Sequence, residues 1–108
     1  MEILTTISSP WPFAQWRIDI VGPLSQGKGQ VKFLLVAIDY FKKWVEAEAL
    51  ATITKARIQN FMWKNIICRF GIPRTIISDN ERQFDSQSFR DFCSGPGIKN
   101  QFSSLRHL

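Results

Sequence analysis

Two aspartates of the 108-residue chain stand in apolar surroundings, which makes them candidates for metal chemistry. Asp19 interrupts the apolar run 18–21, and Asp79 directly follows the β-branched run 74–78. A buried carboxylate is costly unless a cation or a metal accompanies it. Two facing carboxylates repel each other, and an oxygen-preferring ion such as Mg²⁺ or Mn²⁺ removes that repulsion. The alternative is structural: Asp79 forms a turn with Asn80, and Asp19 faces solvent.

Two other titratable residues compete for a chemical role. Asp39 ends the apolar run 31–39, and residue types alone leave it open as a rival carboxylate. His107 is the single histidine and lies beside the last residue of the chain, where frayed surface is the usual state. We therefore do not expect His107 to act as a catalytic base.

Aromatic side chains next to lysines raise a second possibility, contact with nucleic acid. The sequence Lys42-Lys43-Trp44 combines charge with an aromatic ring, as single-strand binding proteins do. Core packing of Trp44, with solvated lysines, is the alternative. The cluster of Trp11, Phe13 and Trp16 is likewise open to both interpretations, packing or a base-stacking platform.

Three strands are predicted in the first half of the chain. Residues 15–21 are rich in Ile and are stopped by Gly22-Pro23, whereas 25–29 forms a turn. Residues 31–40 are nearly all apolar, which predicts a central strand buried on both faces. Residues 44–50 alternate between apolar and acidic types, which predicts a strand with one solvent-facing side. The short connections favour an antiparallel meander.

The second half changes to helical spacing. A helix is predicted to start at Thr52 or Thr54 and to end at Gly71, and a fourth strand over 74–78 follows. Asp85 or Ser86 starts a second helix, and 98–102 is a fifth strand. The residues predicted to share one face of the first helix are Ile58, Phe61, Met62, Ile66 and Phe70. The order β-β-β-α-β-α-β predicts an α/β fold, a mixed sheet flanked by helices, over residues 13–108 after an irregular lead-in at 1–12.

Composition limits the class of protein. Hydrophobic residues make up 44% of the chain and charged residues 21%, which argues against disorder. No run of about 18 apolar residues or secretory leader is present, so we expect neither a membrane span nor secretion. Cys68 and Cys93 are too few for a zinc framework and are expected to be reduced thiols. The net charge of +5 permits nucleic-acid binding, or an ordinary solvated basic surface.

Three ordered segments resemble the catalytic cores of retroviral and retrotransposon integrases. They are residues 16–23 (WRIDIVGP), residues 36–47 (VAIDYFKKWVEA), and residues 70–80 (FGIPRTIISDN) with Gln83-Phe84 after them. The likeness is strongest to polyproteins of plant long-terminal-repeat retrotransposons of the Ty3/gypsy type and covers about residues 10–107. Three motifs in the expected order and strand placement are far more specific than one short motif.

The resemblance implies a ribonuclease-H-like fold and metal-dependent polynucleotidyl transfer on DNA. In that family two aspartates and a glutamate hold two Mg²⁺ or Mn²⁺ ions. Asp19 matches the first family aspartate and Asp79 the second, while Asp39 matches no catalytic position. The resemblance further implies DNA as partner, allows a homodimer, and suggests a nuclear or cytoplasmic location.

The chain also departs from the family pattern. The family glutamate lies farther beyond the second aspartate than Leu108, so we expect a truncated core that lacks the later helices and is inactive alone. Glu81 stands where the family usually has glycine. The alternatives are a non-catalytic, basic nucleic-acid-binding remnant, or a transposon relic without function in which part of an apolar sheet stays uncovered.

Overall fold

The computed structural model describes residues 11–25, 31–79 and 83–102. The strands are β1 (Gln15–Ser25), β2 (Val31–Asp39), β3 (Val45–Leu50), β4 (Thr75–Ser78) and β5 (Lys99–Phe102). The helical segments α2 (Lys55–Phe61), η1 (Met62–Ile67) and α3 (Cys68–Phe70) run on without a break, and α4 (Gln87–Ser94) lies between β4 and β5. The predicted element order is confirmed. Most of the lead-in, most of the 25–29 turn and residues 103–108 lie outside the described residues.

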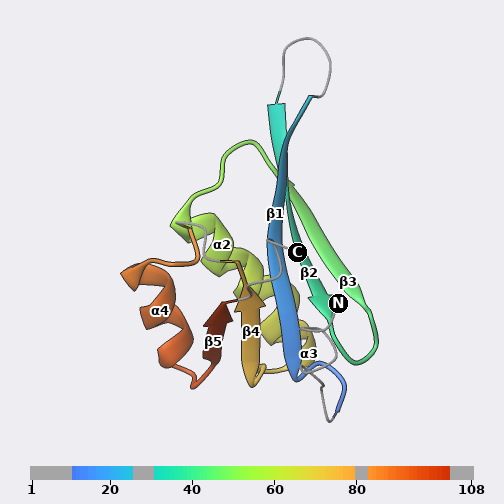
Figure 1. Cartoon of the computed structure of the whole chain (residues 1–108), viewed down its shortest axis with the longest axis vertical. Coiled ribbons are helices and arrows are strands. Elements are labelled where there is room, and N and C mark those ends of the chain that lie inside the picture. The colour runs from blue at the N-terminus through green and yellow to red at the C-terminus, as the bar shows by residue number, and fades with distance from the viewer. Residues whose placement is uncertain (1–10, 26–30, 80–82, 103–108) are drawn as a thin grey trace.

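The five strands form one mixed sheet in the order β3-β2-β1-β4-β5 (Figure 1). β1 pairs antiparallel with β2, and β2 antiparallel with β3, as expected for a meander. β4 pairs parallel with β1, and β5 parallel with β4. β1 therefore lies at the centre, where it joins the antiparallel half of the sheet to the parallel half.

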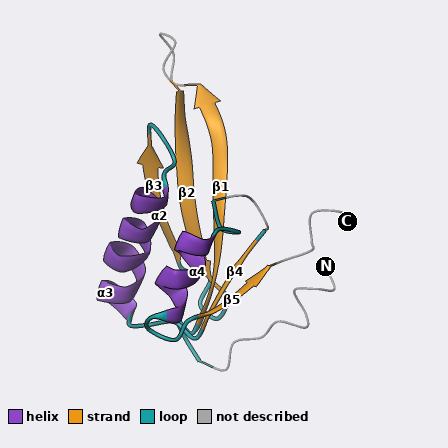
Figure 2. Ribbon diagram, turned by 90° about the vertical axis from the view of Figure 1, so that its left-hand side faces the viewer, coloured by secondary structure: helices purple, strands orange, loops and turns teal. Residues whose placement is uncertain are grey.

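The helices cover one face of the sheet, called here the helix face (Figure 2). Alternate residues of each strand point to opposite faces, so the core takes every second strand residue. The buried strand residues of this face include Trp16, Ile18, Leu35, Ala37 and Ile76. The helices contribute Ile58, Phe61, Met62, Ile66, Phe89 and Cys93 to the same core. The side of the first helix that was predicted to be buried is confirmed at Ile58, Phe61, Met62 and Ile66.

The first strand is longer than predicted. Gly22-Pro23 does not end β1, which continues to Ser25 after a shift in register between Val21 and Leu24. Proline has no amide hydrogen for the ladder, and a bulge is a position where a strand tolerates it. Gly22 has φ +131, and a Cβ there would lie 3.1 Å from the Lys32 carbonyl oxygen. The bulge therefore depends on glycine at this position.

The exposed side of β3 is the apolar one, contrary to the usual arrangement of an alternating strand. Val45 is 54% exposed, and Ala47 and Ala49 are exposed with it, whereas Glu46 faces the helices and is 6% exposed. β2 is likewise not buried on both faces, because Ile38 is 37% exposed. We call this second sheet face the outer face.

Helix ends follow the sequence signals. The Thr54 side chain accepts a hydrogen bond from the Arg57 amide, and the Ser86 side chain accepts one from the Phe89 amide. Each N-cap satisfies a backbone donor that the first helical turn leaves open. Gly71, at φ +96, ends the first helical run as predicted. The π-helical turn η1 in the middle of that run was not expected from the sequence.

Glu46 joins β3 to the helical run through a buried polar contact. Its Oε1 accepts hydrogen bonds from Asn65 Nδ2 and Arg69 Nη1, both at 3.2 Å. Its Oε2 accepts one from Trp44 Nε1 at 2.6 Å. A buried carboxylate is tolerated when it is paired in this way, which explains why an acidic side chain of β3 points toward the helices.

Removing this carboxylate should destabilise the fold. We expect Glu46→Ala to lower the free energy of unfolding by about 2 kcal/mol, because it leaves the donors of Trp44 and Asn65 without an acceptor. Denaturant unfolding measures the change. Glu48→Ala is the matched control on the same strand: its ion pair with Lys64, at 4.0 Å, is partly exposed, so the loss should stay within about 0.5 kcal/mol. Equal losses in the two variants would contradict the role given to Glu46.

Candidate metal site

The parallel pairing of β1 with β4 brings the two predicted carboxylates together. Arg17 lies opposite Ile77 in this pairing. Asp19 lies two residues after Arg17, and Asp79 lies two residues after Ile77, just beyond the end of β4. Residues two apart in extended chain point to the same face. Asp79 follows the last residue of β4, at the strand's carboxyl end, where sites of such sheets commonly form. The two aspartates thus lie side by side on the outer face.

Asp19 is half-buried and sits among groups of both signs. Its Oδ1 accepts a hydrogen bond from the Ile20 amide at 3.2 Å, and its Oδ2 lies 3.9 Å from Arg17 Nη2. Burial raises the pKa of the Asp19 carboxyl above its ordinary value. Arg17 lowers this pKa, the negative charge of Asp79 raises it, and the Ile20 amide lowers it. The net upward shift shows that the folded chain disfavours the charge of Asp19.

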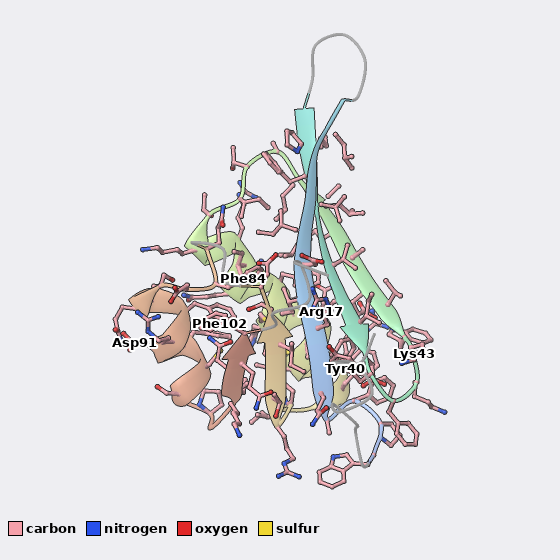
Figure 3. All side chains as sticks on the ribbon, viewed as in Figure 1. Arg17, Tyr40, Lys43, Phe84, Asp91 and Phe102 are labelled. Atoms are coloured by element: carbon pink, nitrogen blue, oxygen red, sulfur yellow. The ribbon has the colours of Figure 1, made fainter. Side chains whose placement is uncertain are left out.

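Arg17 is a member of this site that the residue-type argument missed. Its side chain is 23% exposed, and Figure 3 labels it on β1. Asp19 lies two residues farther along the same strand, so the two side chains share a face. The spacing was a usable signal, since residues i and i+2 of a strand share a face. Arg17 supplies a positive charge near Asp19, while Asp79 supplies a negative one.

The donor set fits a hard divalent cation. Two carboxylates on adjacent strands offer oxygen ligands, and their mutual repulsion, visible in the pKa of Asp19, is what a bound cation would relieve. Within the described ranges, no group of three or more Asp, Glu, His or Cys side chains comes together. Among the described residues, this pair of carboxylates is therefore what the chain offers to a cation at this place.

Asp39 belongs to a different part of the structure. It pairs opposite Trp16, so its side chain points to the helix face, away from Asp19. It is fully buried, and its carboxylate accepts hydrogen bonds from the amides of Phe13, at 2.9 Å, and Lys42, at 2.7 Å. These bonds hold the entry to β1 against the turn after β2. Geometry thus gives Asp39 a structural role and separates it from the aspartate pair.

Some of the other residues singled out in the sequence are described by the structure and some are not. Asn80, Glu81 and His107 lie outside the described residues. Both cysteines are free thiols, Cys68 exposed and Cys93 buried, and burial raises the pKa of Cys93 to about 11. In the part of the chain that the structure describes, no helix is long and apolar enough to cross a membrane.

Comparison with known proteins identifies the family. The integrase core domain model matches residues 10–107, which is nearly the whole chain. The chain belongs to the integrase core domain family. Its five-stranded mixed sheet with helices is the ribonuclease-H-like fold of integrase catalytic cores, so the predicted fold class is confirmed.

Relatives of known sequence are much longer than this chain. A Caenorhabditis elegans protein of uncharacterised function is 32% identical over 102 residues, covering 90% of this chain and 8% of its own length. The Gag-Pol polyprotein of avian reticuloendotheliosis virus is 34% identical over 87 residues, covering 81% of this chain and 8% of its own length. The chain thus corresponds to a small part of each.

Solved structures show the same architecture. The catalytic core domain of HTLV-2 integrase, solved in complex with magnesium in a trimeric form, superposes with a TM-score of 0.78 at 26% identity. The match covers 91% of this chain and 64% of that one. An intasome of simian T-cell lymphotropic virus, in complex with a PP2A regulatory subunit, contains a chain with a TM-score of 0.80 at 24% identity, of which 34% is covered.

The electrostatics of Asp19 generate a stability prediction. Because its pKa is raised in the folded chain, Asp19 weakens the fold as pH rises through that pKa. We expect Asp19→Asn to raise the Tm in metal-free buffer at pH 7 and to melt like the wild type near pH 3, where the carboxyl is protonated in both states.

Asp85→Asn serves as the control for that experiment. Asp85 is 49% exposed and pairs with Arg90 at 2.7 Å on the surface, and such exposed pairs contribute little. Calorimetric melts across the pH range measure both variants. A lower Tm for Asp19→Asn at pH 7 would contradict the repulsive environment described for this site.

Proposed function

We propose that Asp19 and Asp79 are the metal ligands and catalytic carboxylates of a DNA-integration active site. The observation that carries this proposal is their placement, Asp19 on β1 and Asp79 directly after the parallel neighbour β4, close enough for the charge of Asp79 to contribute to the raised pKa of Asp19. Both match the family's aspartate positions by motif. The magnesium complex of the HTLV-2 core domain supports Mg²⁺ or Mn²⁺ as the ion.

The proposed chemistry is displacement at a DNA phosphorus atom. A divalent ion, when bound, would polarise a phosphate oxygen and favour ionisation of a water or a DNA 3′-hydroxyl. Asp19 and Asp79 would hold that ion through their carboxylate oxygens, and the pairing of β1 with β4 would keep the two carboxylates at a constant separation. Arg17 would hold the Asp19 side chain in place through its ion pair with Oδ2.

The 108 residues carry two of the three carboxylates that the family uses. We infer that a polypeptide of residues 1–108 does not transfer DNA strands by itself, because two carboxylates leave the ions under-coordinated. A basic nucleic-acid-binding role, supported by the net charge of +5, is the second candidate function.

Two finer features belong to the same proposal. The motifs at 16–23 and 36–47 support an origin in a plant retrotransposon polyprotein of the Ty3/gypsy type. The exposed apolar side chains of Ile38 and Val45 on the outer face support self-association. The HTLV-2 core domain has been solved in dimeric and trimeric forms, which supports a homodimer here as well.

Metal binding is testable without activity. We expect 10 mM Mn²⁺ to raise the Tm of the chain by about 5 °C, because an ion that binds only the folded state stabilises it by mass action. Asp19→Asn and Asp79→Asn should each abolish this rise, whereas Asp85→Asn should retain it. Differential scanning calorimetry gives the comparison, and an unchanged Mn²⁺ response in both aspartate variants would refute the site.

Catalysis requires a second experiment. The 108-residue chain should show no strand transfer on an oligonucleotide substrate with Mn²⁺ present. Fusing the family's next helix, with its glutamate, to the carboxyl end should restore metal-dependent transfer, and Asp19→Asn should remove it again. Activity that survives Asp19→Asn in the fusion would show that Asp19 is not catalytic.

A further inference from the structure

Three exposed aromatic rings gather at the end of the sheet that lies away from Asp79. β1 and β4 begin at this end and β2 finishes there (Figure 1). Trp11 is 46% exposed, and Phe41 and Trp44 are each 48% exposed. Asp39 connects the segments that carry them, because its carboxylate binds the amides of both Phe13 and Lys42. The two segments that carry the rings are therefore connected to each other at this end of the sheet.

Cationic side chains accompany these rings. The Arg74 guanidinium lies 5.1 Å from the centre of the Trp11 ring, and Lys42 and Lys43 lie between Phe41 and Trp44 in the turn after β2. All three cations are exposed. Figure 3 shows Lys43 beside Tyr40 at this end, with the ammonium 5.9 Å from the ring centre. We call the surface formed by Trp11, Phe41, Lys42, Lys43, Trp44 and Arg74 the aromatic–basic patch.

The Trp44 ring and the backbone of the turn that carries Phe41 are held in place from behind. The Trp44 indole donates its hydrogen to Glu46 at 2.6 Å, and its edge meets the Phe70 ring at 6.3 Å between centres. The turn that carries Phe41 is fixed by Asp39, whose carbonyl oxygen accepts a 2.8 Å bond from the Lys43 amide. A ligand that stacks on these rings therefore has little ordering to impose, which favours binding.

The two carboxylates behind the patch are occupied. Asp39 is fully buried and bonded to two backbone amides, and Glu46 is bonded to Trp44, Asn65 and Arg69. Their negative charges are thus turned inward, while the positive charges of Lys42, Lys43 and Arg74 face outward. The patch is complementary to a polyanion.

We propose that the aromatic–basic patch binds a single-stranded segment of nucleic acid, with unpaired bases on its rings and phosphates at its cations. Ring faces stack on any unpaired base, and lysine and arginine side chains follow the backbone. A duplex keeps its bases stacked on one another, and an acidic peptide would leave all three rings in water. Unpaired nucleotides use both the rings and the cations of the patch. They therefore fit it better than a duplex or an acidic peptide does.

This site is separate from the aspartate pair. Asp79 follows the carboxyl end of β4 and Asp19 lies near the middle of β1, whereas the patch surrounds the end at which both strands begin. The proposal therefore does not depend on the metal site, and the two can fail independently.

Fluorescence anisotropy with a labelled twelve-nucleotide oligo(dT) tests the proposal on the 108-residue chain without metal. Phe41→Ala and Trp11→Ala should each weaken binding about tenfold, as expected for losing one stacked base. The double variant Lys42→Gln/Lys43→Gln should reduce the slope of log K against log salt by about 1.4, or about 0.7 for each phosphate contact. Thermal melts confirm that the variants are folded.

The controls use residues of the same type outside the patch. Trp63, 55% exposed on η1, and Lys55, exposed on α2, supply Trp63→Ala and Lys55→Gln, which should bind like the wild type. An equal loss in Trp63→Ala, no loss in Phe41→Ala, tighter binding of a duplex, or equal competition by polyglutamate would each overturn the proposal.

Discussion

The parallel pairing of β1 with β4 is the contact on which the rest of the structure depends. It joins residues about sixty positions apart, opposing Gln15 to Thr75 and Arg17 to Ile77. Through it, Trp16 and Ile76 enter the same core beneath the helices. The same register sets Asp19 beside Asp79 on the outer face. Because side chains alternate along a strand, a slip of one residue would carry Asp19 to the helix face and Trp16 out of the core.

Most of the architecture could be predicted from the sequence, because the spacing of apolar residues and the residues that start and end each helix indicated the same elements. Ile58, Phe61 and Ile66 repeat at helical spacing, and Thr54 caps the helix that buries them. The orientation of β3 was not readable, because alternation fixes two faces without saying which is covered. Glu46 is buried through donors on Asn65 and Arg69, which are 19 and 23 residues away, so local sequence carries no signal of it.

In the candidate site too, features set by neighbouring residues could be predicted, whereas features set by residues distant in the sequence could not. Asp19 and Asp79 could be named because each stands out in an apolar segment, and the family resemblance separated them from Asp39. That Asp39 instead ties two segments together depends on the amides of Phe13 and Lys42, and backbone amides leave no trace in a sequence. The bulge at Gly22-Pro23 was missed for a related reason, since both residues usually end strands.

Paramagnetic Mn²⁺ can test, residue by residue, whether one cation site forms where β1 and β4 run side by side. In a ¹H–¹⁵N correlation spectrum, trace Mn²⁺ broadens the amides nearest the ion. We expect broadening to centre on Asp19, Ile20 and Asp79 and to spare Lys42 and Lys43 around Asp39. Broadening centred on the turn after β2, or spread evenly over the acidic side chains, would contradict the proposed site.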